Sequence, residues 1–146
     1  MNIVLDTNVV SELMRPRAAP AVCAWVQARA NASLWITSVT QAELWFGARV
    51  LRPGQKRQTL EEMLGLIFDE DFAGRIWPFD SAAASACADI LSQRRAAGRP
   101  MSQFDGQTAA IARVHGAAVA TRNLADFEGC GLTLHNPWLD AAAQQN

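Results

Sequence analysis

The chain begins with a short apolar run, Ile3-Val4-Leu5, that stops on a carboxylate, Asp6. A helix-like segment follows from Val9 to Met14, so the run is interpreted as a buried strand that leads into a helix. Asp6 is therefore expected at the carboxyl end of the first strand. In an open parallel α/β sheet ligands bind at that edge, so this acid indicates where other functional side chains should gather.

Strand-like and helix-like segments alternate along the rest of the chain. Further strands are predicted at residues 34–37, 76–80, 117–120 and 132–134, and Pro78 places the third strand at a sheet edge. The helices between them are predicted to start at the caps Ser38 (in a capping box with Gln41), Asp80, Ser102 and Asn123. This order predicts an α/β fold, with a central parallel sheet of four to five strands flanked by helices.

The composition fits one domain. Of the 146 residues, 50% are hydrophobic and 18% are charged, which excludes a disordered chain. No apolar run reaches the ~20 residues that span a bilayer, and the N-terminus lacks a secretory signal. Three separated cysteines, Cys23, Cys87 and Cys130, fit reduced thiols in a cytoplasmic protein. We expect a domain over residues 1–140 and a frayed tail over 141–146.

Several acids follow strands or lie in the first turns of the next helices. They are Asp6, Glu43, Asp80, Asp105 and Asp126. Each has an ordinary explanation, because acids near a helix N-terminus favour the dipole and cap the backbone. Together they belong to one sheet edge, where two carboxylates about 5 Å apart repel by roughly 3 kcal/mol. Such a cluster favours a cation, and oxygen-only ligands select Mg²⁺ or Mn²⁺.

A hard cation at this edge suits hydrolysis of a phosphodiester by metal-activated water. Twelve of the thirteen basic residues are arginines, the residue type best suited to phosphate. Eight of them are candidates for a rim around the acidic centre: Arg15, Arg17, Arg49, Arg52, Arg57, Arg94, Arg95 and Arg99. For any single arginine, a solvated helix face is the simpler interpretation.

Motifs spread over nearly the whole chain now carry a family resemblance. They are Asp6-Thr7-Asn8 with Ser11-Glu12, Ala42-Glu43-Leu44 with Gly47, Pro100 with Asp105 and Ala109-Ala110-Ile111-Ala112, Ala120-Thr121-Arg122-Asn123 with Asp126-Phe127, and Asn136-Pro137-Trp138. In this order they resemble a PIN domain, and more narrowly the VapC/FitB-type toxins of bacterial type II toxin–antitoxin systems. The resemblance implies a Mg²⁺-dependent endoribonuclease. It also implies a homodimer, a cognate DNA-binding antitoxin that neutralises the toxin, and a larger toxin–antitoxin assembly on operator DNA.

The resemblance assigns roles to individual residues. It places the catalytic and metal-binding acids at Asp6, Glu43, Asp105 and Asp126, with Asp6 and Asp105 as the main ligands. Asn8 and Thr121 match polar positions that hydrogen-bond the acids or the attacking water. Asp80 lies outside this set, so it is expected only to cap a helix. Thr108 departs from the pattern, because an aliphatic residue is expected there.

Two other functions are considered. A non-cleaving PIN-like scaffold that binds RNA or protein would have no reason to keep four carboxylates. A phosphatase of the haloacid-dehalogenase type needs an Asp where this chain has Asn8, and a lysine late in the chain, where there is none. The tryptophans are expected mostly in the core, although Trp45 and Phe46 are candidates for a dimer or antitoxin contact.

Overall fold

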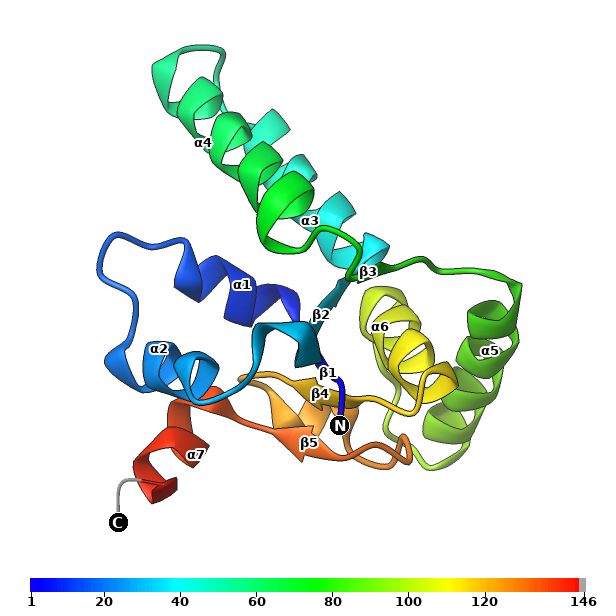
Figure 1. The fold of residues 1–146 in the computed structure, drawn as a ribbon. Helices are drawn as coiled ribbons and strands as arrows, with labels where there is room; N and C mark the ends of the chain where they lie inside the picture. Colours follow the sequence, from blue (N-terminus) through cyan, green and yellow to red (C-terminus); the bar gives the residue numbers. More distant parts are fainter. Residues whose placement is uncertain (145–146) are drawn as a thin grey trace.

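The computed structural model describes residues 1–144, and its centre is a five-stranded parallel sheet in the order β3-β2-β1-β4-β5. The strands are β1 (Ile3–Leu5), β2 (Leu34–Thr37), β3 (Ile76–Trp77), β4 (Ala118–Ala120) and β5 (Leu134–His135). The predicted parallel α/β fold is confirmed, and β3 lies at the edge that Pro78 indicates. Because β1 is central, the residue that follows it lies in the middle of the carboxyl edge (Figure 1).

The described residues also form seven α-helices and three short turns of helix. They are α1 (Thr7–Leu13), α2 (Pro20–Gln27), η1 (Asn31–Ser33), α3 (Ser38–Arg49), α4 (Gln55–Leu66), η2 (Ile67–Asp71), α5 (Ser81–Ala96), α6 (Gln103–Val114), η3 (Leu124–Phe127) and α7 (Pro137–Gln144). Gly98 and Gly116 follow α5 and α6 with positive φ angles of 72° and 63°, a conformation that suits glycine at a helix end. No helix within residues 1–144 is long and apolar enough to cross a membrane.

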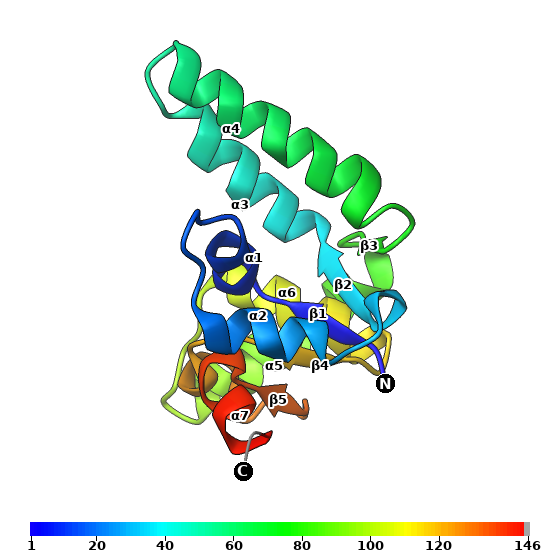
Figure 2. The same ribbon diagram turned by 60° about the vertical axis from the view of Figure 1, so that its left-hand side comes forward.

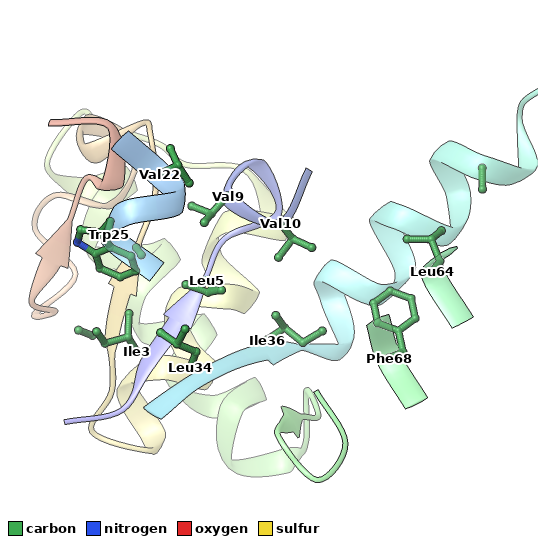
Figure 3. Close-up of a cluster of buried hydrophobic side chains, with 13 residues drawn as sticks. Ile3, Leu5, Val9, Val10, Val22, Trp25, Leu34, Ile36, Leu64 and Phe68 are labelled. Carbon is green, nitrogen blue, oxygen red and sulfur yellow. The ribbon is translucent and has the colours of Figure 1, made fainter. Parts of the chain in front are cut away.

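The sheet separates two hydrophobic cores because side chains alternate along β1. Ile3 and Leu5 pack with residues of α1, α2, α3 and α4, including Trp25 (Figure 3). Val4 points to the other face, where it packs with residues of α5 and α6 such as Ile90 and Ile111. Burial on both faces fixes the sheet, so the side chains at the strand ends start from a rigid frame.

Helices α3 and α4 lie side by side and project from the body as an arm (Figures 1 and 2). Trp45 of α3 packs against Phe68 with 5.4 Å between ring centroids. Phe46, the next residue, is 69% exposed. The base of the arm therefore belongs to the core, whereas Phe46 points away from it.

The local predictions need some corrections. The cap of α3 is Thr37, whose Oγ1 accepts from Thr40 N at 3.2 Å, because Ser38 Oγ instead accepts from the Phe79 amide. Strand β5 covers 134–135 where 132–134 was predicted. Asp80 and Ser102 do cap α5 and α6. Of the predicted tail, residues 141–144 belong to α7, and residues 145 and 146 lie outside the described residues.

Candidate metal and nuclease site

A pocket of about 470 Å³ opens at the carboxyl edge of the sheet, and the four acids assigned by the family resemblance all line it. These are Asp6, Glu43, Asp105 and Asp126, which come from β1, α3, α6 and η3. Asp80 is not among the lining residues, in agreement with its expected role as a cap. The structure thus brings together acids that are up to 120 positions apart in the sequence.

Asp6 occupies the point where the direction of sheet growth reverses. The chain adds β2 and β3 on one side of β1 and then returns to add β4 and β5 on the other side. Side chains at such a switch point face a crevice that no connection covers. Asp6 also caps α1, because its Oδ1 accepts from the Thr7 amide at 2.9 Å.

The second oxygen of Asp6 is held by side chains from two other parts of the site. Thr121 Oγ1 donates to Asp6 Oδ2 at 2.9 Å, and Asn8 Nδ2 lies 3.4 Å from the same oxygen. Asn8 Nδ2 also donates to Thr121 Oγ1 at 3.2 Å. Thr121 is fully buried directly after β4. The hydrogen bonds expected of Asn8 and Thr121 are therefore present, and they fix the Asp6 carboxylate.

Glu43 is held by a hydroxyl that the sequence interpretation did not single out. Thr7 Oγ1 donates to Glu43 Oε1 at 2.8 Å and lies 2.9 Å from Thr40 Oγ1. Thr40 precedes Glu43 by three positions on α3, so both side chains lie on the same face of that helix. The three-residue spacing from Glu43 could have identified Thr40 as a site residue. Thr7 could have been identified because it lies between Asp6 and Asn8 in the sequence.

Asp105 depends on the first turn of α6 for its position. Its amide donates to Ser102 Oγ at 3.1 Å, which anchors the helix start. The next residue, Gly106, allows a close approach to α5, because a Cβ atom there would lie 2.6 Å from Leu91 Cδ2. The absence of a side chain at 106 lets α6 seat Asp105 at the pocket.

Asp126 lies in η3, which a buried arginine ties to α5. Arg94 donates from Nε to the Arg99 carbonyl at 2.7 Å and from Nη1 to the carbonyls of Ala125 and Glu128. Its side chain is 6% exposed. Arg94, a candidate for the arginine rim, is thus buried and outside the pocket lining, because its guanidinium satisfies backbone carbonyls around the Asp126 segment.

Two of the four acids, Asp6 and Asp105, have raised pKa values. Burial is the largest cause that raises the pKa of Asp6 to about 6, and the charges of Asp105 and Glu43 add to it. Hydrogen bonds from Thr121 and Thr7 act in the opposite direction. Burial also raises the pKa of Asp105, helped by Asp126 and opposed by the Ser102 hydrogen bond and by Arg94. The pocket lining contains five acidic and two basic side chains, so acidic groups predominate there.

The donor set of the pocket fits a hydrated hard cation. Its acids offer carboxylate oxygens, the ligands that Mg²⁺ and Mn²⁺ prefer. Within the described part of the chain, no three His, Cys, Asp or Glu side chains are grouped closely enough to form a preassembled metal cage. Mg²⁺ usually binds through one or two carboxylates and keeps several waters, so the pocket can hold it without a larger group of protein ligands.

A polar stripe on α1 also faces the pocket. Asn8, Ser11 and Glu12 of α1 line it at the i, i+3 and i+4 spacing of one helix face, and Arg15 lines it from just beyond the end of the helix. Asn8 was predicted as a site residue, but Glu12 was not. The spacing was visible in the sequence, and applying it to polar residues would have found Glu12.

Most of the predicted arginine rim lies elsewhere. Arg57 pairs with Glu61 on α4, and Arg99 pairs with Glu128. Of the eight candidates, only Arg15 is among the residues that line the pocket. Arg122, which was not a candidate for the rim, also lines it. Trp45 is partly buried against the core, whereas Phe46 has an exposed ring, and a dimer or antitoxin contact at these residues stays a prediction.

Comparison with known proteins places this site in a family context. Residues 3–128 match the PIN domain family. The chain is 40% identical to the VapC ribonuclease Y4jK of Sinorhizobium fredii over 93% of its length and 97% of that protein. It is 38% identical to the toxin FitB of Neisseria gonorrhoeae, covering 94% and 99% of the two chains. A solved structure of FitAB bound to a DNA fragment superposes with a TM-score of 0.87 at 36% identity, covering 93% of this chain and 95% of that one.

Proposed function

This chain belongs to the PIN domain family, in its VapC/FitB group, and on that premise we propose that it is a metal-dependent endoribonuclease toxin. The observation that carries the proposal is the convergence of Asp6, Glu43, Asp105 and Asp126 on one pocket. Burial, with a smaller contribution from neighbouring carboxylates, raises the pKa values of Asp6 and Asp105, and a bound cation would stabilise their charged forms. The ribonuclease name of a relative that matches nearly the whole chain supports RNA as the substrate.

Each acid has a role that follows from its position. Asp6 and Asp105 would hold the ion, because the family resemblance assigns both as ligands and both line the pocket. Glu43 and Asp126 would complete the site from the arm and from η3. A bound Mg²⁺ or Mn²⁺ ion supplies charge neutralisation at the phosphate and lowers the pKa of water. Thr121 and Asn8 keep the Asp6 carboxylate oriented, and Thr7 does the same for Glu43.

The partners follow from the relatives and remain part of the proposal. FitB is named a toxin, and FitAB has been solved on DNA, which supports a cognate antitoxin and an assembly on operator DNA. The exposed ring of Phe46 on α3 is compatible with a homodimer or an antitoxin contact.

Cleavage of a mixture of cellular RNAs by the purified protein tests the proposal. We expect cleavage with Mg²⁺ or Mn²⁺ and its loss in EDTA. Asp105→Asn should reduce the rate by about a thousandfold or more, because it removes an ion ligand while leaving the helix cap in place. Asp80→Asn is the matched control, since this acid caps α5 away from the pocket and Asn is an equally good cap.

Two results would contradict the proposal. Cleavage by Asp105→Asn at the parental rate would remove this residue from the site. RNA binding without cleavage, combined with no heat of Mg²⁺ or Mn²⁺ binding in calorimetry, would instead support the non-cleaving scaffold.

A further inference from the structure

We propose that Arg15 and Arg122 are fixed phosphate anchors of the pocket, and that Glu12 and Trp138 hold them in place. This inference rests on the proposed ribonuclease function, because it names how RNA is gripped at that site. An acidic pocket repels the RNA backbone, so cations are needed where the strand enters and leaves. Arg15 and Arg122 are the two basic side chains among the residues that line the pocket.

Arg15 is anchored by the buried carboxylate of Glu12. Glu12 is 6% exposed, and Arg15 Nη1 lies 3.4 Å and 3.5 Å from its two oxygens. The Ala19 amide donates to the same carboxylate at 3.4 Å. Since a buried carboxylate needs a partner, Glu12 restrains one nitrogen of the guanidinium. The Arg15 side chain remains 67% exposed, which leaves it accessible to a ligand.

Arg122 is anchored differently, by an aromatic ring and by its own backbone. Its Cζ lies 5.0 Å from the centroid of Trp138, within the range of a cation–π contact. Its amide donates to Asn8 Oδ1 at 3.3 Å, and its carbonyl accepts from Asn136 Nδ2 at 3.3 Å. It directly follows Thr121, which bonds Asp6. The position of Arg122 is thus tied to the Asp6 carboxylate.

The two guanidiniums reach one pocket from the end of α1 and the end of β4. A planar guanidinium pairs with phosphate oxygens through two parallel hydrogen bonds, which suits it to hold a phosphodiester backbone. Their anchors matter because a restrained side chain loses less conformational entropy when it binds. The competing explanation is that Arg15 only neutralises Glu12 and that Arg122 only packs on Trp138.

Salt-dependent RNA binding separates these explanations. The affinity of a labelled single-stranded RNA is measured by fluorescence anisotropy in EDTA, which prevents metal-dependent cleavage, at several KCl concentrations. Arg15→Gln and Arg122→Gln should each weaken binding about tenfold and lower the slope of log Kd against log salt by about 0.7. Arg17→Gln removes the same charge two positions from Arg15, at an exposed residue outside the pocket lining, and should leave the slope unchanged.

A double-mutant cycle tests the positioning role of Glu12. Glu12→Gln should weaken RNA binding about threefold in the parent and have no effect in the Arg15→Gln background, because it acts through Arg15. For the second anchor, Trp138→Leu should weaken binding about threefold, whereas Trp138→Phe keeps an aromatic face and much of the affinity. Thermal unfolding of each variant detects any general loss of stability.

The outcomes are distinct. A slope for Arg15→Gln and Arg122→Gln equal to that of the parent overturns the proposal, as does a Glu12→Gln effect that persists without Arg15. A parent that shows these slopes but never cleaves RNA contradicts the proposed function and leaves the phosphate anchors standing.

Discussion

Asp6 and Asp105 share one pocket, yet the structure holds them in different ways. Asp6 follows the central strand, is 8% exposed, and receives hydrogen bonds from Thr7, Thr121 and Asn8. Asp105 lies in the first turn of α6, is half-buried, and depends on the Ser102 cap and on Gly106 for its place. The strand-end acid is fixed by the sheet, whereas the helix-borne acid is fixed by how its helix is capped and packed.

This difference predicts that substitutions near the two acids will have different effects. The three donors around Asp6 orient its carboxylate before any ion arrives, although burial and neighbouring acids raise its pKa. Asp105 has a raised pKa from the same main cause, burial, but it lies in the first turn of a helix that is placed by the Ser102 cap and by close packing at Gly106. Substitutions near Asp6 should therefore change the charge or the orientation of its carboxylate. Substitutions near Asp105 should change the position of its carboxylate in the pocket. Three experiments test that division.

The largest expected effect concerns the charge of Asp6. Its pKa is about 6 in the folded protein against 3.8 as the ordinary value. Between these values the folded state binds a proton that the unfolded state has lost, so stability falls as pH rises. In metal-free buffer, Asp6→Asn should be more stable than the parent, by an amount that grows from about pH 4 to about 3 kcal/mol above pH 7. Chemical denaturation across this range measures the difference.

Magnesium provides the control for the Asp6 prediction. At pH 8 saturating Mg²⁺ should raise the Tm of the parent and have much less effect on Asp6→Asn, because the ion offsets the charge of Asp6. A stability difference that is the same at every pH would show that the buried charge does not set it.

A smaller effect is expected when a hydrogen bond that orients the Asp6 carboxylate is removed. Thr121→Val removes the hydroxyl that donates to Asp6 Oδ2 and should lower Mg²⁺ affinity by about 10- to 100-fold, as is usual for residues that orient ligands. Calorimetric titration measures the affinity. Thr108→Val makes the same change at a buried residue of α6, where an aliphatic side chain is the family expectation. It should leave the affinity unchanged, and equal losses in the two variants would argue against an orienting role for Thr121.

The smallest effect tests the helix that carries Asp105. Ser102→Ala removes the cap of α6, and Asp80→Ala removes the cap of α5; each should lower the free energy of unfolding by about 1 kcal/mol. Only Ser102→Ala should also weaken Mg²⁺ binding, severalfold, because it loosens the turn that seats Asp105. If both variants lose affinity equally, general destabilisation explains the result, and the proposed contrast between the two acids fails.

Some features of this site were predictable because they depend on short-range patterns. The burial of Ile3 to Leu5 and the helix after it place Asp6 at a strand end, and the Ser102–Asp105 spacing places the second acid in a first helical turn. Parallel strands present their carboxyl ends at one edge, so the convergence of the acids also followed. The Ser38 cap failed because Thr37 competed for the same helix start.

Other features depended on contacts between distant residues. Arg94 looked like a surface arginine in sequence, but the packing of α5 against η3 buries it among backbone carbonyls. The bond from Thr7 to Glu43 joins α1 to α3, and no local spacing relates the two residues. Such long-range pairs form only when the chain folds, so the periodicity of the sequence cannot predict them.

The parallel α/β architecture and the family could be predicted from local properties, namely the hydrophobic period, the helix caps and the order of the motifs. The family resemblance then assigned the four candidate acids. Local patterns could not predict which arginines line the pocket, how deeply Asp6 is buried, or which hydroxyls hold the carboxylates. These depend on the desolvation and the hydrogen-bond partners that distant segments supply, and both exist only in the folded chain.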